Sequence, residues 1–232
     1  NIWRFPYLAA KYGGGIFLLV YIILALTFGY TLIMAETSLG RTTRKSPVGA
    51  FESFGNSRFI SIGGWINAII PILIVPYYSV IGGWVIKYLI EYFAGHSKTL
   101  AGDAYFTTFI SNGWSTEICF IIFTLFTLGI IYAGVRNGIE RVSKFMMPIL
   151  IVLSLIIAVY SVTRPGAIEG VKYFLVPNFD HFSWMTVVSA MGQMFYSLSI
   201  AMGILITFGS YMKKDTSIEK STENVEIFDT AI

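Results

Sequence analysis

Long apolar runs separated by short polar stretches dominate the chain and predict a series of membrane-crossing helices. A hydrocarbon core of roughly 30 Å requires about twenty consecutive apolar residues in a helix, and several of the runs approach or exceed that length. We expect spans near residues 16–38, 60–94, 116–134, 144–163 and 186–211, after a partial helix at 1–12 and before the start of a further span at 227–232. The pattern therefore predicts one all-α transmembrane domain over residues 1–232, incomplete at both ends.

Polar and glycine-rich segments separate these runs. Gly13, Gly14 and Gly15 break the first segment from the second, as glycine runs do. Polar connectors follow at 41–58, 95–115 and 165–180, and the chain is polar again from Met212 to Glu226. Aromatic residues within 95–115 predict a short interfacial helix inside that connector.

The distribution of Lys and Arg orients the spans. Alternate connectors carry ten and six of the sixteen basic residues. Cytoplasmic loops of membrane proteins are enriched in Lys and Arg, so the richer set is assigned to the cytoplasm. We therefore expect a multi-pass protein of the plasma membrane with residues 41–58, 135–144 and 212–226 in the cytoplasm and Arg4 facing outward.

The composition agrees with this class and excludes others. Hydrophobic residues make up 55% and charged residues 12% of the chain, and the mean hydropathy of +0.70 is far from that of a soluble globule. The net charge of +3 is scattered rather than gathered in a basic stripe, which argues against nucleic-acid binding. Cys119 cannot form an intrachain disulfide, and His96 and His181 lack neighbours at ligand spacing, so we propose neither a transition-metal site nor an enzymatic activity.

The centre of the last complete span carries Gln193, Ser197 and Ser199 with nearby glycines, where a lipid-facing helix would have Leu and Ile. Irregular backbone at this depth is tolerated only where it lines a cavity or packs within protein. A break after Ser197 would offer carbonyl groups to a small cation and aim the N–H groups of the next half-helix at an anion. A continuous helix that packs closely through its small residues fits the sequence equally well.

Three other polar side chains lie in or beside apolar runs. Arg4 is either functional or a side chain that reaches the membrane face. Tyr78 lies mid-span, where a phenol needs a hydrogen-bond partner, although an interfacial aromatic belt is the alternative. Ile74 precedes Tyr78 by one turn and shares its face. Glu36 is expected to bond backbone or connector groups rather than to relay protons.

Four motifs resemble those of the neurotransmitter:sodium symporter family. They are Asn1-x-x-Arg4-Phe5-Pro6 followed by three glycines, Tyr77-Tyr78, Gly138-Ile139-Glu140-Arg141, and Gln193-x-x-Tyr196-Ser197-Leu198-Ser199 leading to Tyr211. The resemblance implies an all-α LeuT-type transporter fold with discontinuous helices 1 and 6. It also implies that the chain runs from the end of helix 1 to the start of helix 7, which is most of the first inverted repeat plus the first helix of the second.

The resemblance assigns roles to individual residues. Residues matching the substrate pocket are Ile74, Tyr78, Tyr196, Ser197, Ser199 and Met202. Residues matching sodium ligands are Asn1 and Ser197. Residues matching the gates are Arg4, Tyr78, Tyr196 and Tyr211. Tyr21, Gln193 and Ser197 match three positions that bind chloride in chloride-dependent relatives, and chloride dependence stays open.

The expected function is sodium-coupled symport of a hydrophobic or aromatic L-amino acid by alternating access, with sodium as the co-transported ion. The pocket residues Ile74, Tyr196 and Met202 give an apolar lining, and we expect no Asp or Glu beside them to pair with an amine that lacks a carboxylate. A channel-like protein or a non-transporting membrane scaffold is the alternative. The expected partners are the amino acid, sodium and the lipid bilayer, and the oligomeric state stays open.

Overall fold

The computed structural model describes residues 4–55 and 57–231. The chain divides into two compact units, which are described separately. The first unit comprises Asn1–Ile70 and Ile151–Ile232, and the second comprises Pro71–Leu150. Two long helices, α5 (Arg58–Phe93) and α9 (Arg141–Val162), begin in one unit and continue in the other. The single domain predicted from the sequence stays a prediction.

The first unit begins with α1 (Arg4–Lys11), which ends at the expected glycine break. Gly13 and Gly14 have φ angles of 104° and 59°, which L-residues with side chains rarely adopt. A Cβ on Gly14 would lie 2.2 Å from the carbonyl oxygen of Tyr173, so the close approach of these two segments requires glycine.

A long apolar rod follows the break. It consists of α2 (Gly15–Leu24), the π-helical turn η1 (Ala25–Gly29) and α3 (Tyr30–Thr43), and it is a candidate membrane span over Gly15–Thr43. The rod therefore runs past the predicted end at residue 38. The short helix α4 (Pro47–Glu52) lies in the polar connector, where Ser46 caps it and Pro47 occupies its first turn.

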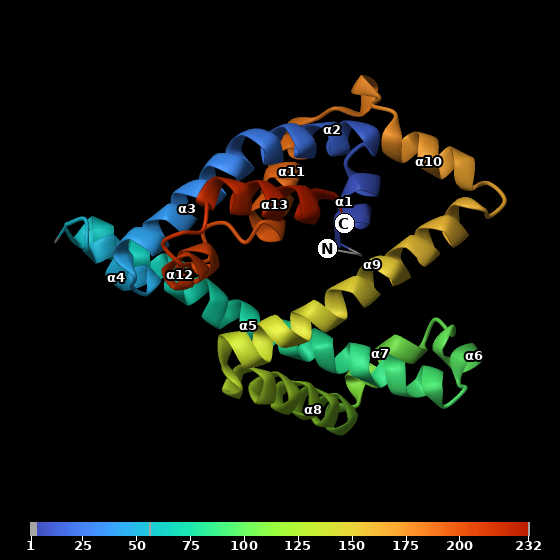
Figure 1. Ribbon diagram of the computed structural model, residues 1–232. Helices are drawn as coiled ribbons and strands as arrows, with labels where there is room; N and C mark the ends of the chain where they lie inside the picture. Colours follow the sequence, from blue (N-terminus) through green and yellow to red (C-terminus); the bar gives the residue numbers. More distant parts are fainter. Residues whose placement is uncertain (1–3, 56, 232) are drawn as a thin grey trace. The chain divides into compact units, whose positions relative to one another are not determined.

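The remaining elements of the first unit come from the other end of the chain. They are α10 (Ala167–Leu175), η3 (Phe179–His181), α11 (Trp184–Ser197), α12 (Ile204–Tyr211) and α13 (Ile218–Ala231). In Figure 1, α11, α12 and α13 lie alongside the rod formed by α2 and α3. Buried side chains of α2, α3 and α11, among them Phe17, Ile33 and Met194, form the core of this unit.

Two of these helices lie where the sequence predicted polar connectors. Helix α10 occupies part of 165–180, and α13 begins at Ile218 rather than near residue 227. The side chain of Ser217 accepts a hydrogen bond from the N–H of Lys220 at 3.3 Å and so caps the start of α13. A capped amphipathic helix can include many charged residues, which a search for apolar runs does not detect.

The second unit contains most of α5, together with α6 (Ser97–Leu100), α7 (Tyr105–Ser111), α8 (Gly113–Tyr132), η2 (Val135–Glu140) and the start of α9. Helix α7 is the short helix expected in the 95–115 connector. Gly83 lets α5 approach the backbone of α8, since a Cβ there would lie 2.8 Å from the nitrogen of Phe120. Within the described residues, α5, α8 and Asn137–Val162 are further candidate membrane spans by length and composition.

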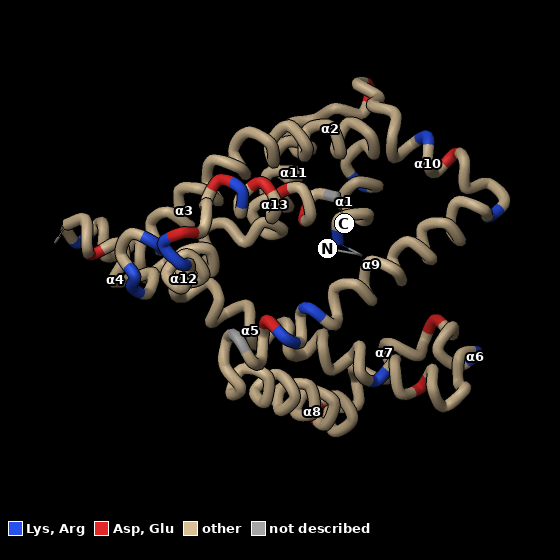
Figure 2. The backbone as a smooth tube through the Cα atoms, viewed as in Figure 1, with Lys and Arg blue, Asp and Glu red and all other residues tan. Residues whose placement is uncertain are grey.

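Basic side chains at the end of the first unit where α4 lies bond to backbone carbonyl groups. Arg41 donates hydrogen bonds to the carbonyl oxygens of Lys214 and Thr216, and Arg44 donates to that of Ser210 at 3.0 Å. These bonds satisfy carbonyls at and beyond the C-terminus of α12, which have no partner within the helix. Figure 2 shows the basic residues gathered near α4 and α12.

Candidate functional site

The backbone is broken between α11 and α12. Helix α11 ends at Ser197 and α12 starts at Ile204, with turns between them. Ser199 and Ala201 have φ angles of 56° and 60° although they carry side chains. Such conformations are uncommon, and they cluster at functional sites. Of the two interpretations that the sequence left open, the broken helix is the one observed.

Side chains from two other helices bind the backbone of the break. A carboxylate oxygen of Glu36 on α3 accepts a hydrogen bond from the N–H of Ala201 at 2.7 Å. The side-chain oxygen of Asn67 on α5 accepts one from the N–H of Gly203 at 3.2 Å. Glu36 thus bonds backbone, which is the structural role expected for it.

The sequence suggested that the N–H groups at the start of α12 face an anion, and this stays a prediction. Just before α12, the N–H groups of Ala201 and Gly203 donate to protein side chains. One of the two acceptors is a carboxylate, which already supplies the negative charge that a helix N-terminus favours.

An acidic side chain lies at the other end of the break. The hydroxyl of Ser197 donates a hydrogen bond to Asp229 at 2.6 Å, and the phenol of Tyr21 also reaches the side chain of Ser197. Asp229 therefore lies beside Ser197, one of the predicted pocket residues. The expected absence of an acid concerned Ile74, Tyr196 and Met202, and it stays a prediction. Sequence reasoning missed Asp229, although it is the one acid in the apolar stretch 227–232.

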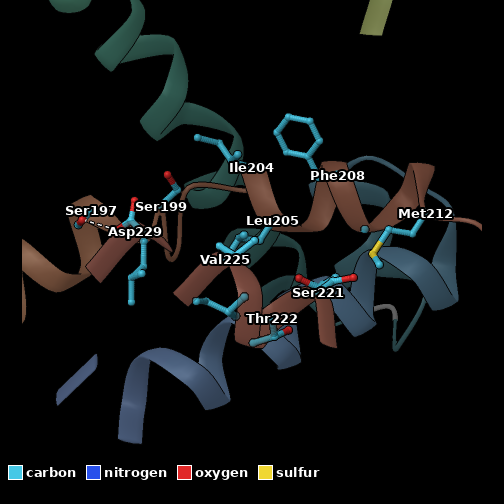
Figure 3. Close-up of a pocket in the computed structure, with 14 residues that line it drawn as sticks. Ser197, Ser199, Ile204, Leu205, Phe208, Met212, Ser221, Thr222, Val225 and Asp229 are labelled. Atoms are coloured by element: carbon cyan, nitrogen blue, oxygen red, sulfur yellow. Dashed lines mark hydrogen bonds between the residues drawn. The ribbon is translucent and has the colours of Figure 1, made fainter. Parts of the chain in front are cut away.

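A cavity of about 300 Å³ adjoins these groups. Figure 3 shows it between the break, α12 and α13, with the dashed bond from Ser197 to Asp229 at one end. Polar atoms come mainly from the serines at 197, 199 and 221, with Thr222 and Asp229. Most of the remaining lining is apolar and comprises Ile33, Leu198, Ile204, Leu205, Phe208, Met212 and Val225. An apolar cavity with a few grouped polar atoms is the usual form of a small-molecule site.

Two of the expected gate residues lie together. The guanidinium carbon of Arg4 is 4.3 Å from the ring centroid of Tyr196, which is a cation–π distance. Arg4 therefore contacts the residue just before the break. Tyr211, at the far end of α12, is 63% exposed.

The other predicted site residues are distributed as follows. Ile74 and Tyr78 share one face of α5 in the second unit, where the Tyr77 and Tyr78 rings pack edge to face with centroids 5.9 Å apart. Met202 lies in the break but does not line the cavity. Gln193 is fully buried on α11, one turn before Ser197. Asn1, the expected sodium ligand, lies outside the described residues.

Comparison with known proteins identifies the family. Residues 1–120 and 90–231 match the sodium:neurotransmitter symporter family. The chain belongs to this family. The resemblance seen in the sequence motifs is thereby confirmed.

Symporter relatives include an uncharacterized sodium-dependent transporter of Bacillus subtilis, which is 32% identical over 100% of this chain and 52% of its own length. The human inactive sodium-dependent neutral amino acid transporter B(0)AT3 is 29% identical over 95% of this chain and 40% of its own length. Among solved structures, MhsT in complex with L-phenylalanine matches with a TM-score of 0.90 and 34% identity, over 99% of this chain and 53% of MhsT. The chain spans about half the length of the Bacillus subtilis relative and of two further sodium-dependent transporters that it matches.

Family membership fixes the general class. The chain has the all-α LeuT-type fold predicted from its motifs, and the α11–α12 break is the discontinuous sixth helix of that fold. The family consists of membrane transporters and not of enzymes, and the long apolar helices are those of a multi-pass membrane protein. The roles that the motifs assign to individual site residues stay proposals.

Proposed function

We propose that the full-length protein couples sodium entry to uptake of a hydrophobic or aromatic L-amino acid across the plasma membrane, by alternating access. The observation that carries the proposal is the α11–α12 break, where Ser197, Asp229 and an apolar cavity meet. A transporter needs ion and substrate to share a site, because each ligand can then raise the affinity of the other by the same factor.

Sodium is the ion that the polar end of this site fits. Hard cations bind oxygen ligands, and the break offers a serine hydroxyl, a carboxylate and nearby backbone carbonyls. The negative charge of Asp229 offsets the charge of the cation in a part of the molecule with little water. Asn1 would supply a further amide oxygen.

The apolar lining favours a hydrophobic substrate. Phe208, Met212 and Val225 lie around the cavity, and methionine adapts to rings of different shape. MhsT, whose structure holds L-phenylalanine, supports the aromatic option by similarity. Within this proposal Tyr78 binds the substrate carboxylate, while Ile74, Tyr196, Ser199 and Met202 complete the pocket. Arg4 and Tyr196 form the outer gate, and Tyr211 contributes to the inner gate.

Asp229 also affects whether transport should depend on chloride. It bonds Ser197, which is one of the three residues at chloride-binding positions, and Tyr21 contacts the same serine. A carboxylate at this place repels a second anion. We therefore infer that transport does not require chloride.

Uptake of labelled L-phenylalanine into proteoliposomes after a sodium jump tests the proposal, with chloride and gluconate compared as counter-ions. We expect sodium-driven uptake in both, with competition by hydrophobic amino acids and not by amines that lack a carboxylate. Competition by the amines alone would contradict the substrate assignment. Binding without uptake would favour a non-transporting protein, a possibility raised by the relative named inactive.

The tyrosine pair offers a test of substrate recognition. We expect Tyr78→Phe to weaken substrate binding by about 1.5–3 kcal/mol, the contribution of one hydrogen bond to a charged group. The ring remains, so packing should change little. Tyr77→Phe is the matched control, since it removes a neighbouring phenol from a different face of α5. Equilibrium binding at fixed sodium measures both, and equal affinities in wild type and Tyr78→Phe would show that Tyr78 only packs.

Ser197 offers a test of ion recognition. Ser197→Ala removes one oxygen ligand and the hydrogen bond to Asp229, and it should lower sodium affinity by about tenfold. Substrate affinity should fall with it at low sodium and recover as sodium is raised. Ser210→Ala is the control, because the Ser210 hydroxyl bonds only within α12 at 2.6 Å among the bonds described. Curves for wild type and Ser197→Ala that stay parallel across the sodium titration would remove Ser197 from the ion site.

A further inference from the structure

Helix α12 and the break before it contact α3 and α5 in different ways. Against α3 the backbone of α12 touches that of α3, because Gly40 faces the carbonyl of Ile206 and Gly209 faces that of Thr37. At α5, the N–H of Gly203 in the break donates a hydrogen bond to the side chain of Asn67. Close-packed backbones have no side chains to rearrange, so α3 and α12 behave as one body. The Asn67 bond is a contact that can be exchanged.

The side chain of Asn67 is oriented by two bonds. Its amide nitrogen donates to the carbonyl oxygen of Gly63 one turn earlier on α5, at 3.0 Å. Its oxygen is therefore directed at the N–H of Gly203, at 3.2 Å. This arrangement is the only one of the two amide orientations in which both atoms have suitable partners.

The backbone conformation of Gly203 places its N–H to donate this bond. Its φ angle is 67°, in the left-handed region, and it directly precedes the first residue of α12. A Cβ on Gly203 would lie 2.7 Å from Pro47 Cγ and 3.0 Å from the carbonyl oxygen of Asn67. The backbone of α5 and the break therefore approach each other directly at this point.

An asparagine is an unfavourable residue in the interior of an apolar helix, because its side chain competes for backbone bonds. Asn67 follows Gly63, Gly64 and Trp65 and precedes a long apolar run in α5. If this position served only to pack α5 against its neighbours, Leu or Ile would suit it better. The hydrogen bond from Gly203 to the Asn67 side chain explains why an amide is present here instead.

We propose that Asn67 is a positioning residue, a releasable latch that ties the break between α11 and α12 to α5. The proposal rests on the proposed function, since the break carries Ser199 and Met202, and α5 carries Ile74 and Tyr78 further along its sequence. With the latch closed, the break is held in the conformation described here. With it open, α12 moves with α3, and the break is free to adopt the conformation of another transport state.

Hydrogen exchange of the full-length protein tests the latch without requiring transport. Asn67→Leu keeps the size and removes both bonds, and amide exchange in residues 200–207 should become faster by up to about tenfold, the factor of one neutral hydrogen bond. Asn67→Asp keeps an acceptor for Gly203 and should restore slow exchange. Thr207→Val is the control, because it removes a bond to the Gly203 carbonyl within α12 itself, at 2.8 Å.

Transport kinetics supply the second measurement. Loss of the latch should raise the KM for substrate by about three- to tenfold while the maximal rate per folded molecule is kept or increased. Loss of a merely structural bond would instead reduce the amount of folded protein at an unchanged KM. If Asn67→Leu does not yield folded protein, Asn67→Ser removes the reach to Gly203 without added bulk and carries the same expectations.

The outcomes separate the latch from the proposed function. Faster exchange in residues 200–207 of Asn67→Leu, reversed in Asn67→Asp, supports the latch even if the wild-type protein transports nothing. In that case only the proposed function fails. Unchanged exchange in Asn67→Leu overturns the latch, whatever the wild-type protein transports. Altered exchange together with an unchanged KM overturns its role in positioning the substrate site.

Discussion

We expect sodium-driven uptake to be lost when Asp229 is replaced by Asn, and apparent sodium affinity to fall at least about tenfold, or 1.4 kcal/mol. The carboxylate accepts the Ser197 hydroxyl at 2.6 Å and is the acidic group among the residues lining the cavity. Asn keeps the shape and an oxygen but not the charge. In the proposed site the carboxylate charge offsets that of the cation, so we expect the missing charge to outweigh the retained oxygen.

A sodium titration of substrate binding in the full-length protein measures this effect. Asp215→Asn is the control, because Asp215 is exposed in the connector before α13 and undergoes the same chemical change. The interpretation predicts that high sodium partly restores substrate binding in Asp229→Asn. If substrate affinity falls equally at all sodium concentrations, Asp229 pairs with the substrate amine instead, and the ion assignment is wrong.

We expect Gly40→Ala to destabilise the protein by at least about 3 kcal/mol, near the upper end of what single substitutions do. A Cβ at this position would lie 1.9 Å from the carbonyl oxygen of Ile206 and 2.7 Å from its carbonyl carbon. Both are backbone atoms, so no side chain can move aside. Helices α3 and α12 would have to separate, and the break that α12 follows would lose its support from Glu36.

Thermal unfolding in detergent, followed by the fraction that remains monodisperse, measures the loss. Gly129→Ala on α8 is the control, since among the described residues no heavy atom outside the adjacent backbone of α8 lies within 4 Å of the Cβ it would add. That substitution should be neutral or should stabilise the helix by up to about 1 kcal/mol. Equal melting temperatures for Gly40→Ala and wild type would show that α3 and α12 do not pack as described.

The sequence predicts best the helices that contain long runs of apolar residues. The rod from Gly15 to Thr43, the long α5 and the apolar part of α9 all contain runs that only a membrane or a core can accommodate. Glycine and serine residues between 192 and 203 indicated either a break or a closely packed continuous helix, and the break between α11 and α12 is the one observed. The charged helix α13 and the amphipathic α10 were missed because their residues do not form apolar runs. The π-helical turns η1 and η2 were not predicted from the sequence.

The site was predictable where the chain itself carries the irregularity. Ser197 and Ser199 are unusual residues for the middle of an apolar span, so their own segment drew attention to them. The residues that bond to the break from elsewhere in the chain could not be found in this way. The bond from Ser197 to Asp229 joins positions 32 residues apart, and the bond from Gly203 to Asn67 joins positions 136 apart. An asparagine within an apolar helix and an acid within an apolar stretch were the available signals for these two residues. The approach of Ile74 and Tyr78 to the break stays a prediction from the family resemblance.

Equilibrium binding of labelled L-phenylalanine to the full-length protein, measured across a sodium series with potassium as replacement, tests the shared site most directly. If the two ligands share a site, we expect phenylalanine affinity to rise with sodium concentration. We also expect saturating phenylalanine to raise sodium affinity by the same factor, as thermodynamic linkage requires. Phenylalanine binding that is unchanged when potassium replaces sodium would contradict a shared site.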